Sequence, residues 1–527
     1  MGPMRIIVLF FLISICLLFF RCGSQKEYVL SDKNLYWGDL HNHCNVGYAK
    51  GSLERAYEIA QSHLDFFCFT PHTQWHDRPD TGNYQSFTEG FQKAKNDWWK
   101  VVKYADDYYK PGKFVSFIGY EWHSSSYGDN CIIMPGSKGD LLYPGDITEL
   151  QTVAKENNAL LIPHHPAYMK DNRGQNWDFL GPTDITPVVE IISEHGNAES
   201  DRAPIPYILH SHGGRYTKNT VQYLWSQGKQ VGIVGSTDDH LGYPGAYGEG
   251  LVAVYADTLT RESIIEAIRN RRTYAVNADR IELDFRLNGH FMGESIPFTP
   301  KRGIQVNVKG KDVIDRVEVL RNNDVIYRYF PVDRKIKSTS WDKPVLCRIE
   351  FGWGPWSALN IPRTVDWNFD VNVINGKIIS ATPCFQTGPF DENRRNLITS
   401  LDDHHCQFCS YTARRDAFGE RPTNSIILEI HGSPETELDV SLSKPVMKNH
   451  KISLRELAES NDIFYTGNMP MESVMIHRIV FSENYRVDFE FRDKSETEIT
   501  DWYYVRVVQS NGSLAWSSPI WVNKKEK

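Results

Sequence analysis

Histidines and carboxylates follow several short apolar runs of this sequence, and side chains of these types bind divalent metal ions. The first group is Asp39-Leu40-His41-Asn42-His43, in which two histidines are one residue apart after a run typical of a strand. Side chains two apart on an extended segment point to the same side, so His41 and His43 can reach one metal ion or two neighbouring ions. Alone, a His-x-His pair in a chain of 527 residues is weak support for a metal site.

The same residue types recur at the downstream ends of later strand-like runs, and this recurrence is the strongest functional signal in the sequence. Asp238 and His240 are again two apart, and Asp39 could accept a hydrogen bond that orients an imidazole. The strand-end set is His41, His43, His72, Glu121, His164, His165, His195, Asp238 and His240. An ordinary surface or core role is kept for His63, His76, His210, His212 and His290.

The elements that must position these side chains alternate between strand and helix from residue 35 to residue 277. Such alternation predicts parallel strands joined by right-handed crossovers, and almost wholly apolar strands are typical of a sheet buried on both faces. About seven units predict a distorted (β/α)7 TIM-like barrel over residues 35–278, with its chemistry at the carboxyl ends of the strands. Helices are expected at 52–63, 88–109, 147–158, 219–227 and 261–271.

From about residue 280 apolar and polar residues alternate, and turn signals such as Asn288-Gly289 separate the runs. We therefore expect an antiparallel β-sandwich domain over residues 280–525, with a long surface loop from about 385 to 425. In that loop, His404-His405-Cys406-Gln407-Phe408-Cys409 could bind zinc. A structural zinc site needs matched ligands from a second segment, so an ordinary loop or a local disulfide is favoured there.

Residues 1–22 are typical of an export signal. Arg5 precedes the apolar run from Ile6 to Phe20, which has the length of a signal-peptide core and is short for a membrane-spanning helix. Cys22, followed by small polar residues, resembles the lipidation site of a bacterial lipoprotein; an ordinary signal peptide and an uncleaved anchor are the alternatives. We expect a periplasmic, outer-membrane or cell-surface protein of a bacterium, held at the membrane only through a lipid on Cys22.

The composition sets further bounds. A hydrophobic content of 41% and a charged content of 24% are those of a soluble globular protein. A net charge of −8 gives no electrostatic reason to expect a nucleic-acid partner. The cysteines that follow Cys22 are odd in number and irregularly spaced, so they do not describe a disulfide scaffold. These features leave the oligomeric state undetermined.

The strand-end motifs resemble the successive motifs of the PHP (polymerase and histidinol phosphatase) superfamily. More closely, the chain is similar to a bacterial branch catalogued as a domain of unknown function, in which a β domain follows the barrel. The resemblance implies a distorted seven-stranded β/α barrel, a site for two or three metal ions, and phosphoester hydrolysis. The motifs that carry it are Asp39-Leu40-His41-Asn42-His43, Thr70-Pro71-His72, Gly119-Tyr120-Glu121, Pro163-His164-His165-Pro166 and Ser236-Thr237-Asp238-Asp239-His240.

The resemblance also implies roles for individual residues. The implied metal ligands are His41, His43, His72, Glu121, His165, Asp238 and His240, with His165 preferred to His164 because the family's ligand precedes the proline. Catalytic roles fall to Asp238, His240 and His195, and contacts with ligands or substrate to Asp39, His164, His123, Asp129 and Arg202. Thr70-Pro71-His72 replaces the usual Thr-Asp-His, and 44–51 lacks an acidic residue or histidine; either change could leave two metals instead of three.

These inferences favour an exported hydrolase that uses two or three ions of zinc, manganese or iron and a metal-bound hydroxide to cleave phosphoesters. The expected substrate is a small or glycan-derived anion, which Arg173, Arg202 or Arg215 could anchor, although each arginine is more often a solvated surface charge. One alternative is a metal-dependent hydrolase of another bond, such as a sulfate ester or a glycan derivative. The other is a surface lipoprotein without catalysis that binds a glycan or a partner protein.

Overall fold

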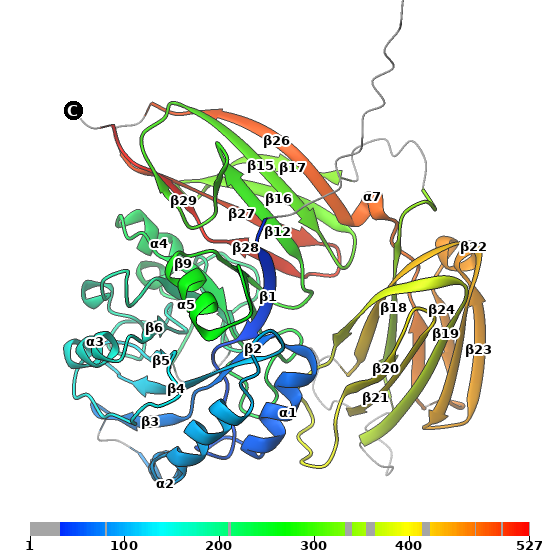
Figure 1. Ribbon diagram of the computed structural model, residues 1–527, viewed down its shortest axis with the longest axis horizontal. Coiled ribbons are helices and arrows are strands. Elements are labelled where there is room, and N and C mark those ends of the chain that lie inside the picture. Colours follow the sequence, from blue (N-terminus) through cyan, green and yellow to red (C-terminus); the bar gives the residue numbers. More distant parts are fainter. Residues whose placement is uncertain are drawn as a thin grey trace, which may run out of the picture.

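Figure 1 shows the computed structural model, which describes residues 32–79, 82–208, 212–331, 340–354, 364–413, 422–469, 471–496 and 499–525. The expected export segment with Cys22 lies outside the described residues, as does His210. Across the described ranges, every helix is too short or too polar to cross a membrane.

The N-terminal unit contains the elements that carry the strand-end residues. Its helices begin within a few residues of the expected positions, because Ser52, Asp146 and Thr260 cap the first turns of α1, α3 and α5. Its helices are α1 (Leu53–His63), α2 (Gln85–Asp107), α3 (Ile147–Glu156), α4 (Val221–Ser226) and α5 (Arg261–Arg269), with short turns η1 (Trp177–Phe179) and η2 (Thr217–Asn219). Its strands are β1 (Asn34–Asp39), β2 (Phe66–Phe69), β3 (His72–Trp75), β4 (Val115–His123), β5 (Asn130–Met134), β6 (Leu160–Pro163), β7 (Val188–Ser193), β8 (Gly196–Asn197), β9 (Gly232–Gly235), β10 (Leu251–Ala256) and β11 (Thr273–Val276).

The prediction of a seven-stranded β/α barrel is wrong. Strands β1, β2 and β4 are parallel, but β5 runs antiparallel to β4 and β6 antiparallel to β5. On the other side of β1, β10 runs antiparallel to β1 and β11 antiparallel to β10. Strands β8, β7 and β9 form a separate three-stranded sheet, so no closed ring of paired strands exists among the described residues. The connection 124–129 between β4 and β5 is too short for a crossover, and it turns the chain into a hairpin.

The first C-terminal unit continues the N-terminal sheet, because β28 pairs with β11. Its four-stranded sheet β13-β12-β15-β26 packs on strands β16 and β27, with Phe285, Val306, Val319 and Val505 in the shared core. Its strands are β12 (Glu282–Leu287), β13 (His290–Phe291), β14 (Ser295–Ile296), β15 (Lys301–Lys309), β16 (Ile314–Arg321), β17 (Asp324–Tyr329), β26 (Arg486–Lys494), β27 (Asp501–Gln509), β28 (Leu514–Ser517) and β29 (Ile520–Val522).

A second C-terminal unit is inserted between β17 and β26, so the single sandwich expected for residues 280–525 is two β units (Figure 1). Its eight strands form one sheet with its own core, which includes Trp367 and Phe369. The expected surface loop at 385–425 contains two of these strands, β20 and β21. The elements are β18 (Val345–Gly352), β19 (Thr364–Cys384), β20 (Leu397–Leu401), β21 (His405–Ala413), β22 (Asn424–Lys444), β23 (Lys448–Ser453), α6 (Leu454–Glu459), β24 (Asp462–Tyr465), β25 (Ser473–Ile476) and α7 (Ser482–Tyr485).

Asp279 joins the three units at one buried point. Its carboxylate accepts two bonds from Arg348 of the inserted unit, at 2.9 and 3.0 Å. It also accepts bonds from Tyr247 of the N-terminal unit at 2.9 Å and from Gln509 and Asn511 of the first C-terminal unit at 2.7 Å each. Because a buried carboxylate needs partners for its lone pairs, this network fixes how the units meet.

Candidate metal centre

The strand-end residues come together in one place, although the strands do not form the expected barrel. The segments after β1 and β9 are held side by side by backbone bonds from Asp238 to His41, at 2.8 Å, and from His43 to Asp239, at 3.0 Å. Glu121 and His123 end β4, His72 begins β3, and the His164–His165 pair follows β6. The chain thus brings together side chains from five separate segments.

The first group of ligand atoms consists of His41, His43, Glu121 and Asp238. The Nε2 atoms of His41 and His43 are 3.1 Å apart, and Asp238 Oδ1 lies 2.9 Å from His43 Nε2 and 3.3 Å from His41 Nε2. Glu121 Oε2 lies 3.4 Å from His43 Nε2. The ring atoms that can coordinate therefore point at one another and at two carboxylates, as in a metal site.

Glu121 and Asp238 each face two groups of histidines. Glu121 Oε2 faces His43 and also His72, whose Nε2 is 3.2 Å away, whereas Oε1 lies 2.6 Å from His164 Nε2. Asp238 Oδ1 faces His43, whereas Oδ2 lies 3.1 Å from His195 Nε2. Carboxylates in this arrangement can bridge two cations that share one cavity.

A second group adjoins the first around Asp129. Asp129 Oδ2 lies 2.9 Å from His123 Nδ1 and 3.3 Å from His165 Nε2, and Arg173 binds it through Nε at 2.8 Å and through Nη2. Burial raises the pKa of Asp129, but the charges of Arg173 and His123 outweigh burial and hold that pKa well below its usual range. Asp129 is therefore a permanent anion beside the candidate ligands.

The burial of this cluster tests whether its residues fit metal ions. Glu121 and Asp238 are each 1% exposed, and Glu121 Oε2 has no hydrogen-bond partner among the described residues. Buried carboxylate oxygens without partners are costly, and a cation would satisfy them. Mixed imidazole and carboxylate donors suit zinc, manganese or iron. Groups whose ligand atoms lie within 4.8 Å of one another include His41/His43/Glu121, His43/His72/His240, His41/His164/Asp238 and Asp129/His164/His165.

Two carboxylates and a tyrosine hydroxyl lie against the Nδ1 atoms of three of these histidines, on the outer side of the cluster. Glu190 Oε2 lies 3.2 Å from His41 Nδ1, Glu194 Oε1 lies 2.8 Å from His240 Nδ1, and the Tyr168 hydroxyl lies 2.8 Å from His195 Nδ1. Such partners fix the ring orientation and the tautomer. Of the three, Glu190 carries a sequence signal, because it is a lone carboxylate within the apolar run Val188–Ile192.

Asp39 does not orient an imidazole, contrary to the expectation. Its Oδ1 accepts bonds from the backbone of His41, at 3.2 Å, and of Thr237, at 3.1 Å. Its Oδ2 accepts from the Thr237 hydroxyl, at 2.5 Å, and from the Gly245 backbone, at 3.0 Å. Asp39 therefore joins the ligand-bearing segments through their backbones.

A cavity of about 400 Å³ opens onto the cluster. Arg173 and His212 line it together, with Arg173 Nη1 3.2 Å from His212 Nε2, so His212 belongs to the site, contrary to the expectation. His164 lines the cavity, whereas His165 lies behind it against Asp129, so the geometry favours His164 over the preferred His165. Arg202 is exposed and does not line the cavity.

The second candidate cluster does not converge. Cys406 is buried in the core of the inserted unit, and Cys409 is half-buried; both are free thiols. His404 Nδ1 is bound at the Gly376 carbonyl, 2.8 Å away, and His405 Nε2 lies 3.1 Å from Asp370. His404 precedes β21, and Cys406 and Cys409, three residues apart on that strand, face opposite sides, so the four side chains share neither a disulfide nor a ligand set.

Comparison with known proteins gives relatives without an assigned activity. A family model described as "Protein of unknown function (DUF3604)" matches residues 72–134, a stretch that holds His72, Glu121, His123 and Asp129. An uncharacterized protein of Chlamydia pneumoniae is 23% identical over 340 residues, and one of Chlamydia trachomatis is 26% identical over 344. Each match covers 59% of this chain, which spans about half (51%) of the relative's own length.

Proposed function

We propose that this protein is a metal-dependent hydrolase that cleaves phosphoesters. The observation that carries this proposal is that Glu121 and Asp238, both buried, each face two histidine groups beneath an open cavity. A purely structural cluster would pair every buried carboxylate oxygen with a donor, whereas here Glu121 Oε2 has no hydrogen-bond partner among the described residues and the Nε2 atoms of His41 and His43 point at each other.

The residues that would hold the ions come from both groups. Divalent ions bound there would supply a Lewis acid for the phosphoryl oxygens and a water of lowered pKa. The proposed ligands are His41, His43, His72, Glu121, His164 and Asp238, with His240 at the rim.

The chain's own side chains would bind and orient the substrate anion. Arg173 presents its guanidinium to the cavity while Asp129 holds it in place, so its direction is fixed before substrate binds. His195 is fixed between the Tyr168 hydroxyl and Asp238 Oδ2, and in that position it could give a proton to the leaving oxygen.

Export and lipidation through residues 1–22 belong to the same proposal.

The test uses the chain purified without residues 1–22. Bound metal is measured by plasma mass spectrometry, and turnover of p-nitrophenyl phosphate and bis(p-nitrophenyl) phosphate is assayed with and without a chelator. We expect bound transition metal and turnover of at least one ester that the chelator abolishes and added metal restores.

The matched control for this test is His290→Ala, which removes an exposed histidine outside the site and should leave metal and turnover unchanged. Bound metal with turnover of sulfate or glycosyl esters alone would reject the phosphoesterase and leave a hydrolase of another bond. A chain that binds no transition metal would reject the enzyme altogether.

A further inference from the structure

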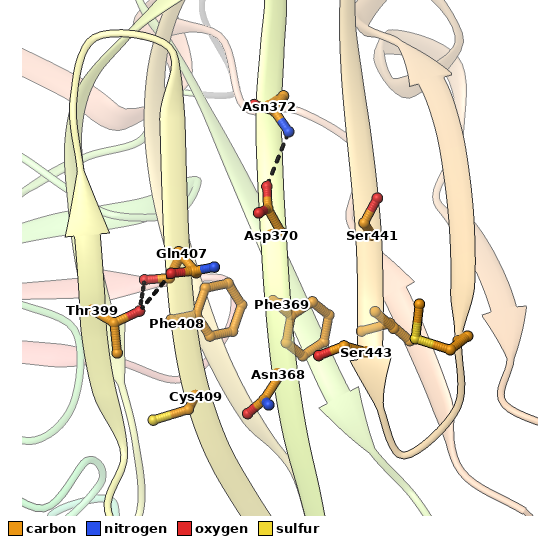
Figure 2. A pocket seen from close by; sticks show the side chains of 12 residues that line it. Asn368, Phe369, Asp370, Asn372, Thr399, Gln407, Phe408, Cys409, Ser441 and Ser443 are labelled. Atoms are coloured by element: carbon orange, nitrogen blue, oxygen red, sulfur yellow. Dashed lines mark hydrogen bonds between the residues drawn. The ribbon is translucent and has the colours of Figure 1, made fainter.

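A groove lined by both polar and apolar groups crosses one face of the eight-stranded sheet of the inserted unit, away from the candidate metal centre. Figure 2 shows that its lining comes from neighbouring strands: Thr399 of β20, Gln407 of β21, Asn368 and Asp370 of β19, and Ser441 of β22. The hollow has a volume of about 620 Å³, which exceeds the 400 Å³ of the cavity at the metal centre. It is therefore large enough to take part of an extended ligand.

Six of the lining residues carry neutral hydrogen-bonding side chains, whereas the exposed Met447 and parts of Phe369, Phe408, Leu442 and Cys409 add apolar surface. Along β19, Asn368, Asp370 and Asn372 alternate with Phe369 and Val371, which are buried in the core. Asp370 is the one charged side chain among the described residues that line the hollow. Amide and hydroxyl groups that both donate and accept match the hydroxyl groups of a sugar, which do the same.

Several of these groups are already held in position. Asn372 Nδ2 donates to Asp370 at 3.0 Å, and Asn449 Nδ2 donates to Ser441 Oγ at 2.8 Å. The Thr399 hydroxyl donates to the Gln407 backbone carbonyl at 3.1 Å. Binding groups fixed on strands lose less conformational entropy when a ligand arrives than groups on loose loops would.

The groove continues beyond this hollow. Asn368 and Cys409 also line an adjoining hollow of about 430 Å³, which Arg395 and Lys444 line as well. Arg395 reaches Glu58 of α1, 3.0 Å away, so the groove extends toward the N-terminal unit. A continuous path along the sheet favours a chain-like ligand over a compact one.

Two other classes of ligand fit this face poorly. A peptide cannot add to it as an extra strand, because β19 is already paired with β21 on one side and β22 on the other. Nucleic acid is disfavoured as well, because the first hollow carries Asp370 and no basic side chain among its described lining residues, on a chain of net charge −8. In the adjoining hollow, Asp366 and Asp391 are both paired with Arg394.

We propose that this groove binds a neutral oligosaccharide. The inference goes beyond the proposed hydrolase and does not depend on it, because no candidate metal ligand lines the groove. Since no exposed aromatic ring lines the first hollow among the described residues, binding rests on hydrogen bonds. We therefore expect dissociation constants of about 0.1–1 mM.

The test is calorimetric titration of the chain without residues 1–22 with cellohexaose, xylohexaose, mannohexaose, maltohexaose and chitohexaose. We expect at least one of these probes to bind, in the presence of a chelator as well as in its absence. Asn368→Ala combined with Gln407→Ala should weaken that binding about tenfold, because two hydrogen-bonding side chains are lost. Ser443→Arg, which places a large side chain in the groove, should weaken it at least as much.

Gln305→Ala is the matched control, because Gln305 is also an exposed glutamine on a strand, on the other C-terminal unit. It should bind like the wild type, and the melting temperature of every variant should match that of the wild type. The proposal is overturned if no probe binds, or if the groove variants bind as tightly as the wild type. It is equally overturned if binding disappears in His41→Ala/His43→Ala, because the sugar would then occupy the metal centre.

Discussion

The Nδ1 atom of His41 lies 3.2 Å from Oε2 of Glu190, a buried carboxylate within β7. This contact leaves His41 Nε2 directed at His43 and Asp238. We predict that Glu190→Gln lowers metal affinity about 10–100-fold, because the amide no longer holds the ring and its tautomer as a carboxylate does. Competition with a coloured chelator measures this loss. An unchanged affinity would show that Glu190 has no part in positioning His41.

His41→Ala combined with His43→Ala should lower bound metal at least tenfold while the chain stays folded. Both rings belong to the first ligand group, and removing them leaves only carboxylates there. Plasma mass spectrometry gives the metal content, and circular dichroism checks the fold. His290→Ala, an exposed histidine near Glu294, serves as the control. Full metal content in the double variant would remove these residues from the ligand set.

Arg173→Lys should raise the KM for a phosphoester about tenfold and leave metal content unchanged. Lysine keeps the charge but loses the planar group that reaches Asp129 and the cavity together. Steady-state kinetics with metal analysis separate the two effects. Arg202→Lys is the control, because Arg202 is exposed and outside the cavity. Equal kinetic changes in both variants would argue against an anion site at Arg173.

The contact between Asp279 and Arg348 should make stability depend on acid pH. Burial raises the pKa of Asp279, but the charge of Arg348 and the bonds it donates outweigh burial and lower that pKa below its ordinary value. A lowered folded-state pKa stabilises the protein above the unfolded pKa of about 4, and this contribution is lost as pH falls through the folded value. Chemical unfolding should therefore show a free-energy advantage over Asp279→Asn at pH 7 that shrinks below about pH 4.

Arg348→Met tests the same contact by removing the cation instead of the carboxylate. It leaves the buried Asp279 carboxylate without its cation, which should cost about 3–5 kcal/mol at pH 7. Most of this loss should disappear in Asp279→Asn/Arg348→Met, because the unpaired charge is then absent. Full additivity of the two changes would show that the pair is not coupled.

The helices of the N-terminal unit and the residues that cluster around Glu121 and Asp238 could largely be predicted from the sequence. The caps at Ser52 and Thr260 and the helical spacing of apolar residues determined α1 and α5. Histidines and carboxylates placed after strand-like runs indicated the residues that meet at Glu121 and Asp238. Each of these features depends on residues that are close together in the chain, so a short stretch of sequence is enough to predict it.

Arg173 and Tyr168 belong to the site only through contacts with Asp129 and His195, more than twenty residues away along the chain. No local pattern distinguishes Arg173 from Arg202 and Arg215, the other two candidate anchors, and none marks Tyr168. The same limit applies to His212, which has an unremarkable sequence context yet lines the cavity with Arg173.

The sequence by itself determined the helices of the N-terminal unit, several of its strands and which strand ends carry the clustered histidines and carboxylates, because backbone propensity and apolar spacing act over a few residues. The tertiary structure alone decided that β4, β5 and β6 alternate in direction, that β28 continues the N-terminal sheet, and that a second β unit interrupts the first. An apolar strand buried on both faces has the same composition whichever way its neighbour runs. Strand direction and partner are therefore set by loop lengths and long-range packing, which no short stretch of the chain encodes.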